Sequence, residues 1–160
     1  MATFHQVDDE VLALANELIE AHHEHLLNKN IGILFRTEAA SSGDKTVLGQ
    51  ASKVSDKINA LFSIEERLDF LIWLAEDWWT DATDKQRRWL LDHELCHCGR
   101  EGKLRSHDVE EFIEIVERHG LVEMSMRSLV RAAQQHTIPG LVEQLQRTGA
   151  VVTPSPAVFN

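Results

Sequence analysis

Residues 93–97 read His-Glu-Leu-Cys-His and lie in a segment that carries signals for both ends of a helix. Thr83, followed three residues later by Gln86, forms a capping-box pattern that is typical of helix beginnings. Gly99 predicts the end, since glycine adopts the backbone conformation that commonly follows a last helical turn. We therefore predict a helix over residues 84–98. Residues four apart share one helical face, so the two histidines should lie side by side, with the glutamate one position further around.

His93, Glu94 and His97 are the residue types, at the spacing, that zinc-dependent hydrolases place on one helix. The two imidazoles are suited to bind Zn²⁺, and the carboxylate of Glu94 is suited to act as general base toward a water held by the metal. Leu95 and Cys96 fill the two intervening positions without a charge, as expected for a helix that packs against a core. The motif predicts a metal-assisted hydrolase.

A catalytic zinc usually has three protein ligands, so one more residue is needed. His107 is our first candidate, because it opens the next predicted helix and can turn inward before the regular helix begins. Zinc also accepts imidazole readily in a half-buried site. Glu111, on that same predicted helix, is the alternative third ligand. On a helix, both residues would lie on the face opposite the apolar residues Val109, Phe112 and Val116. The choice between His107 and Glu111 therefore stays open.

The composition of the 160 residues, 43% hydrophobic and 26% charged, is that of one soluble globular domain, which we place at residues 1–149. The apolar runs are too short to span a membrane, and residues 1–5 lack the pattern of a signal peptide. Cys96 and Cys98 lie too close together for a disulfide framework. We expect a cytoplasmic protein with a mobile tail over residues 150–160.

The formal net charge of −10 argues against nucleic-acid binding, which needs a basic surface. Six of the 16 basic residues nevertheless flank the motif. They are Lys85, Arg87, Arg88, Arg100, Lys103 and Arg105. They can be an ordinary solvated surface, or they can indicate an acidic substrate or partner near the site.

Hydrophobic periodicity predicts an α+β fold, with a small sheet of about three strands on which the helices pack. The predicted strands are residues 31–37, 47–54 and 68–74. The predicted helices are residues 8–29, 84–98, 107–119 (capped by Ser106 and ended by Gly120), 122–136 and 141–147. The last two form a helical extension over residues 122–149.

Six segments carry a resemblance to a known family. They are residues 22–26 (HHEHL), 31–36 (IGILFR), 49–55 (GQASKVS), 92–98 (DHELCHC), 107–112 (HDVEEF) and 119–121 (HGL). Together they span about residues 8 to 121, and over this span the chain resembles the putative phage metallopeptidase family. The resemblance implies a zincin-like, zinc-dependent hydrolase fold with the motif on the central helix and an unassigned substrate. It also implies a location in the cytoplasm of the host cell if the chain is phage-encoded. A looser similarity to SprT-like proteases carries no DNA-linked role, because Gly does not follow His107 and Phe112 comes five residues later.

The predicted function is therefore a zinc metallopeptidase that acts on a protein or peptide, which can pair with an exposed edge of the sheet. One alternative is a non-catalytic zinc protein of a phage that binds or sequesters a host partner. A remote alternative is a ferritin-like di-iron protein, since Glu20 with His23 and Glu94 with His97 form E-x-x-H pairs. That alternative requires an all-helical fold. The sequence predicts neither the oligomeric state nor an oxyanion-stabilising residue.

Overall fold

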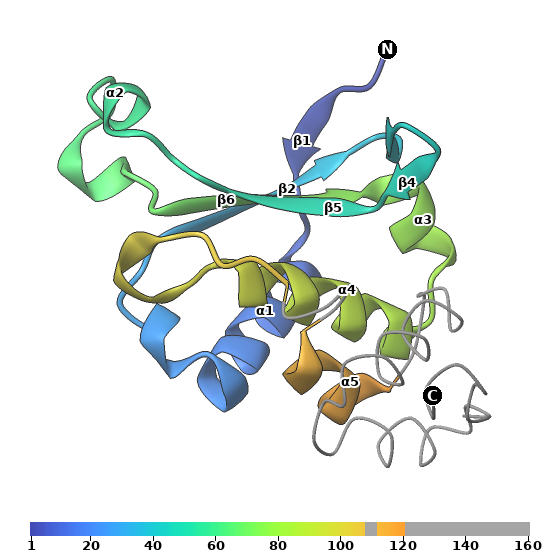
Figure 1. Cartoon of the computed structure of the whole chain (residues 1–160). Helices are drawn as coiled ribbons and strands as arrows, with labels where there is room; N and C mark the ends of the chain where they lie inside the picture. Colours follow the sequence, from blue (N-terminus) through green and yellow to red (C-terminus); the bar gives the residue numbers. More distant parts are fainter. Residues whose placement is uncertain (108–111, 121–160) are drawn as a thin grey trace, which may run out of the picture. The chain divides into compact units, whose positions relative to one another are not determined.

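The computed structural model of the chain describes residues 1–107 and 112–120 (Figure 1). The chain divides into one unit over Met1–Ser106 and a second unit that begins at His107. The predicted helices at 122–136 and 141–147, the tail and Glu111 lie outside the described residues. No helix in the described ranges is long and apolar enough to cross a membrane.

The first unit is built on a four-stranded mixed sheet with the strand order β1-β2-β6-β5. Its strands are β1 (Phe4–Gln6), β2 (Ile31–Arg36), β5 (Gly49–Lys53) and β6 (Phe70–Ala75). The two central strands, β2 and β6, are parallel, while β1 and β5 pair antiparallel at the edges. A separate hairpin joins β3 (Ala40–Ser42) to β4 (Lys45–Val47). This sheet contradicts the all-helical ferritin-like alternative.

The prediction of about three strands was too low. The missed strands β1, β3 and β4 have three residues each, which is too short to show an alternating pattern. The predicted strand at 47–54 also ran across the end of β4 and all of β5. The strands at 31–37 and 68–74 are confirmed as β2 and β6 to within two residues at each end. These two are central strands, whose long apolar runs are the stronger sequence signal.

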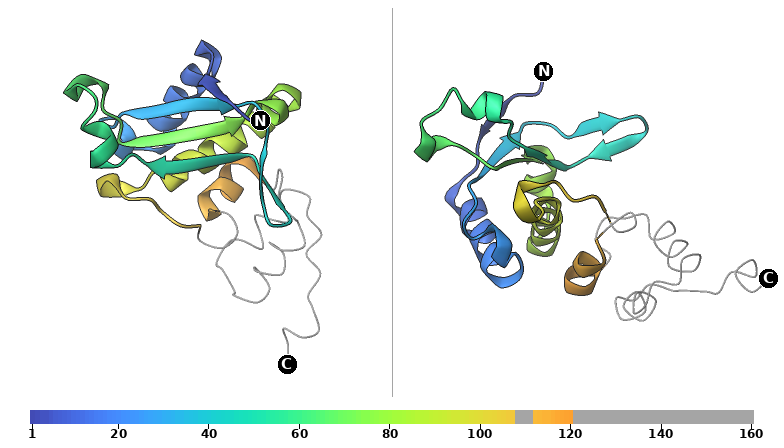
Figure 2. Two further views of the ribbon diagram at one scale, coloured as in Figure 1. Left: turned by 90° about the horizontal axis from the view of Figure 1, so that it is seen from above. Right: turned by 60° about the vertical axis from the view of Figure 1, so that its left-hand side comes forward.

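The core lies between the sheet and the helices on one of its faces, where α1 (Asp9–His22) and α4 (Asp84–His97) pack (Figure 1). Phe70, Ile72 and Leu74 alternate along β6 and are fully buried, as expected for the face that the helices cover. Two short helices, α2 (Asp56–Asn59) and α3 (Glu76–Asp81), lie in the connections before and after β6. Figure 2 shows α1 and α4 running beneath the strands.

Helix α4 begins where the sequence predicted. The backbone N–H of Gln86 donates to Thr83 Oγ1 at 3.2 Å, and the N–H of Thr83 donates to Gln86 Oε1 at 2.8 Å. The helix ends at His97 with Cys98 as its cap, one residue earlier than predicted. Helix α1 begins after Asp8, whose side chain caps it by accepting a hydrogen bond from the N–H of Val11 at 3.0 Å.

The predicted helix over residues 8–29 was too long. Helix α1 stops at His22, and a separate 3₁₀ turn covers Glu24–Leu26. The backbone of His23 leaves the helical region at φ −129° and ψ 53°. Its buried ring bonds to helix α4, so a tertiary contact outweighs the local helical pattern here.

In the second unit the described helix is α5 (Ile113–His119). The predicted helix over residues 107–119 was wrong at its start, because residues 106, 107 and 112 have no helical assignment. Ser106 therefore caps no helix at residue 107. The predicted end is confirmed, since Gly120 follows the helix with φ 72°, where glycine carries no side-chain strain.

Candidate metal centre

Helix α4 brings the two histidines of the motif together. His93 and His97 are half-buried, with their ring centroids 5.2 Å apart. A ring nitrogen of one lies within 4.8 Å of a ring nitrogen of the other. Leu91 and Leu95 are fully buried on the adjacent face and hold the helix on the core. The pair thus lies on one helix at a spacing that is compatible with a shared metal ion.

The ring of His97 is oriented by the chain that follows the helix. Its Nδ1 lies 2.7 Å from the carbonyl oxygen of Arg105, and the N–H of Arg105 donates to the carbonyl of His97 at 2.8 Å. A carbonyl oxygen only accepts, so Nδ1 carries the proton and Nε2 keeps its lone pair. Metal-binding histidines commonly have such a bond on the second nitrogen. The donor set of His97 therefore fits a metal ion.

The loop that supplies this carbonyl, residues 99–105, is folded back on the end of α4. The N–H of Gly99 donates to the carbonyl of Lys103 at 2.8 Å. The backbones of Cys98 and Leu104 pair in an isolated antiparallel β-bridge. A Cβ at Gly99 would lie 2.6 Å from the carbonyl oxygen of Lys103, so a larger residue would displace the loop. Sequence reasoning treated Gly99 only as a helix stop and missed its part in placing Arg105.

Glu94 is buried beneath the start of edge strand β5, with 3% of its surface exposed. A Cβ added to Gly49 would lie 3.0 Å from Glu94 Oε1 and 3.1 Å from the carbonyl oxygen of Trp73. Glycine at this position therefore leaves the room that the carboxylate occupies. The GQASKVS segment contained Gly49, but only the tertiary contact reveals this purpose.

The two candidates for the third metal ligand, His107 and Glu111, lie outside the first unit. His107 is exposed and begins the second unit, with its ring centroid 5.1 Å from that of Phe112. Glu111 lies outside the described residues. His107 and Glu111 therefore stay predictions.

A second cluster of metal-binding residue types lies wholly within residues 1–106. His23 of α1's cap and Asp92 and Cys96 of α4 are each at most 3% exposed, with ligand atoms within 4.8 Å of one another. The Nε2 of His23 lies 2.6 Å from Asp92 Oδ1. Two ligands on one tetrahedral zinc would be separated by about 3.3 Å. The described geometry is therefore that of a hydrogen-bonded pair that joins the two helices.

The HHEHL segment entered the prediction through the family resemblance, and the pairing of His23 with Asp92 was not predicted. Asp92 and Cys96 could have indicated this contact, since an ionisable residue on a buried helix needs a partner. His25 completes the contact, with its Nε2 2.8 Å from the carbonyl oxygen of Cys98.

The two cysteines are buried and form no disulfide. The thiol of Cys98 donates to the carbonyl of Glu94 at 3.8 Å. Burial, followed by the charge of Glu94, raises the pKa of Cys98 to about 12. Cys98 is therefore a protonated thiol at neutral pH and is poorly suited to bind metal in this arrangement.

The fold and this site define an α+β protein in which one buried helix presents two histidines and a glutamate at the edge of a small mixed sheet. A family model described as putative phage metallopeptidase matches residues 3–134. The chain belongs to this family, which confirms the resemblance drawn from residues 8 to 121. No curated protein and no solved structure matches the chain.

Proposed function

We propose that the chain is a zinc-dependent peptidase, with His93, His97 and His107 as metal ligands and Glu94 as general base. The observation that carries this proposal is the bond from His97 Nδ1 to the Arg105 carbonyl, which directs the other nitrogen's lone pair away from the backbone. Zinc, when bound, would lower the pKa of its water and polarise the substrate carbonyl. The family description and the buried carboxylate on the same helix support the proposal.

His107 is preferred over Glu111 because of its covalent distance from the site. It follows Arg105 by two residues, and two residues of extended chain span about 7 Å at most. The backbone of Arg105 is bonded to His97 on both its N–H and its carbonyl. The chain therefore keeps the backbone of residue 107 within reach of the helix that carries the motif.

Glu94 would take a proton from the attacking water and deliver it to the leaving amine. Burial beneath β5 shields the carboxylate from bulk water, which strengthens its interactions with the reacting groups. Within the described ranges β5 pairs with β6 alone, so its other edge is open to a partner. A substrate peptide that added to this edge would pass Gly49 and thus Glu94.

The test measures metal content and cleavage of casein, for the wild type and for Glu94→Gln. We expect one zinc per chain in both proteins and cleavage by the wild type only. Zinc in both with no cleavage by the wild type, across many substrates, would leave the non-catalytic zinc protein as the better proposal. A wild type that holds no stoichiometric metal would overturn the proposal.

The third ligand is tested by comparing His107→Ala with Glu111→Ala. We expect His107→Ala to lower zinc affinity by at least about 100-fold, because a three-ligand site loses one donor. Glu111→Ala should bind zinc like the wild type. If Glu111→Ala alone loses zinc, the ligand is the glutamate.

A further inference from the structure

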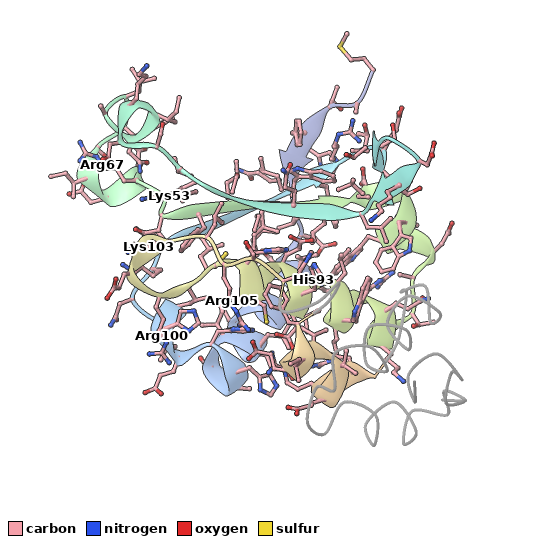
Figure 3. All side chains as sticks on the ribbon, in the orientation of Figure 1. Lys53, Arg67, His93, Arg100, Lys103 and Arg105 are labelled. Carbon is pink, nitrogen blue, oxygen red and sulfur yellow. The ribbon has the colours of Figure 1, made fainter. Side chains whose placement is uncertain are left out.

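Four exposed basic residues gather at one end of edge strand β5, and we call them the cationic rim. They are Lys53, Arg67, Arg100 and Lys103. Lys53 is the last residue of β5 and pairs with Phe70, three residues after Arg67. The other two lie on the loop after α4, which Figures 1 and 2 both place beside this end of β5. Figure 3 shows all four on the same side of the molecule.

The cationic rim is weakly neutralised by its surroundings. Among the described residues, Lys103 is the rim member with an acidic side chain within 4 Å, namely Glu101 at 3.6 Å. Both side chains are more than three-quarters exposed, and such pairs contribute little. Glu66, next to Arg67, directs its carboxylate to the hydroxyl of Ser63. In the described ranges, Lys53, Arg67 and Arg100 thus have no carboxylate within 4 Å, on a chain whose net charge is −10.

The position of the cationic rim relates it to the candidate site. Gly49, at the other end of β5, lies against Glu94, and Lys53 follows four residues later. Four residues of strand span about 13 Å. A peptide paired with the open edge of β5, with its scissile bond near Glu94, would thus bring a residue about four positions away to Lys53.

Exposed apolar side chains in the segments that carry the rim favour a polypeptide over a nucleic acid as the ligand. The segment between β5 and β6 exposes four large apolar side chains, and the loop after α4 exposes another. They are Ile58, Leu61, Phe62, Ile64 and Leu104. Leu61 and Ile64 are 79% and 76% exposed. Apolar side chains of a polypeptide can pack on these exposed residues, whereas a phosphate backbone gains nothing from them.

We propose that the cationic rim binds acidic residues of the substrate polypeptide, about four positions from the scissile bond. This inference rests on the proposed peptidase function and adds the substrate class. The direction in which the peptide runs along β5 decides on which side of the scissile bond the acidic residues lie. The cationic rim is then a specificity determinant that is separate from the metal ligands.

Binding is tested first with zinc-loaded Glu94→Gln, so that no activity is needed. The probes are a fluorescein-labelled 12-residue peptide with four consecutive glutamates and the same peptide with four glutamines. We expect fluorescence anisotropy to show about tenfold tighter binding of the glutamate peptide, and the preference should weaken with salt. Adding Lys53→Glu and Arg67→Glu should abolish it. The matched control adds Lys45→Glu and Lys85→Glu, two exposed lysines outside the cationic rim, and should keep it.

The second measurement uses active wild type on a library of peptides from a digested proteome. Aspartate and glutamate should be enriched about four positions from the cleaved bonds. The kcat/KM ratio for a glutamate peptide over its glutamine counterpart should fall about tenfold in the rim variant and stay unchanged in the Lys45/Lys85 control.

The outcomes separate the two proposals. If no peptide is cleaved but binding follows the charge of the cationic rim, the peptidase proposal fails and the binding role of the rim stands. Cleavage without acidic enrichment, together with equal binding of both probes, overturns the rim proposal alone. Tighter binding of a 20-base-pair DNA duplex than of the glutamate peptide, lost in the rim variant, also overturns it, in favour of a nucleic acid.

Discussion

Helix α4 carries buried polar groups on two faces, and the two faces hold them differently. Toward α1, the carboxylate of Asp92 is bonded to the ring of His23 at 2.6 Å, a side-chain pair that joins two helices. Toward β5, Glu94 lies against Gly49, where no side chain competes for its space. His97, on the motif face, is bonded to the backbone of Arg105.

The two faces have different roles: the face toward α1 stabilises the fold, and the face with the motif positions the residues of the candidate site. A buried pair of complementary side chains satisfies both groups and fixes how α1 packs on α4. In the candidate site, a backbone carbonyl orients the ring of His97, and a glycine leaves room for the carboxylate of Glu94. Substitutions on the two faces should therefore affect different measurements.

The largest expected effect is on activity. Glu94→Gln should lower kcat by about 10³-fold, because an amide cannot accept the proton of the attacking water. The free energy of unfolding should stay the same or rise, since the variant buries no carboxylate. Steady-state cleavage and urea unfolding measure the two quantities on the same preparation. A large loss of stability in this variant would show that Glu94, like Asp92, stabilises the fold.

The opposite face should show the opposite result. Asp92→Ala should reduce the free energy of unfolding by about 3 kcal/mol, because it leaves the buried ring of His23 without its acceptor. Asp92→Asn is the control, since its amide oxygen can still accept the hydrogen bond. Urea unfolding compares the three proteins. Equal stability of Asp92→Ala and the wild type would remove the structural role of this pair.

The two faces were not equally visible in the sequence. The HExxH pattern and the Thr83 capping box act over three or four residues of one helix, so their local geometry was predictable. The pairing of His23 with Asp92 spans 69 residues, and no periodic pattern encodes a contact across that distance. The room at Gly49 depends on which strand crosses Glu94. Strand order was likewise unreadable, whereas the apolar runs of β2 and β6 predicted the sheet itself.

Gly49→Ala should produce a smaller effect that remains specific to the site face. The added methyl would lie 3.0 Å from Glu94 Oε1, so the carboxylate has to shift by a few tenths of an ångström. We expect kcat to fall about tenfold while the free energy of unfolding changes by about 1 kcal/mol. Gly32→Ala is the control on β2, where the methyl meets the flexible end of Leu68. If both variants lose activity in proportion to stability, Gly49 has no positioning role.

The smallest expected effect concerns the surface pair that extends the α1 face of α4. Arg88 donates to both carboxylate oxygens of Glu17, at 2.9 and 3.0 Å. These hydrogen bonds, more than the charge of Arg88, lower the pKa of Glu17 from its ordinary value of 4.5. A carboxylate with a lowered folded-state pKa stabilises the fold above its unfolded pKa. This stabilisation is lost as the pH falls below 4.5 and through the folded value.

Glu17→Gln should therefore be slightly less stable than the wild type at pH 6 to 7, and the difference should shrink as the pH falls below 4.5. Urea unfolding across this pH range measures it. Because both side chains are roughly half-exposed, added salt should also reduce the difference. In an Arg88→Met background the Glu17→Gln difference should disappear at every pH, since the partner is gone. A difference that persists in that background would mean that Glu17 acts through contacts within α1 and not through Arg88 on α4.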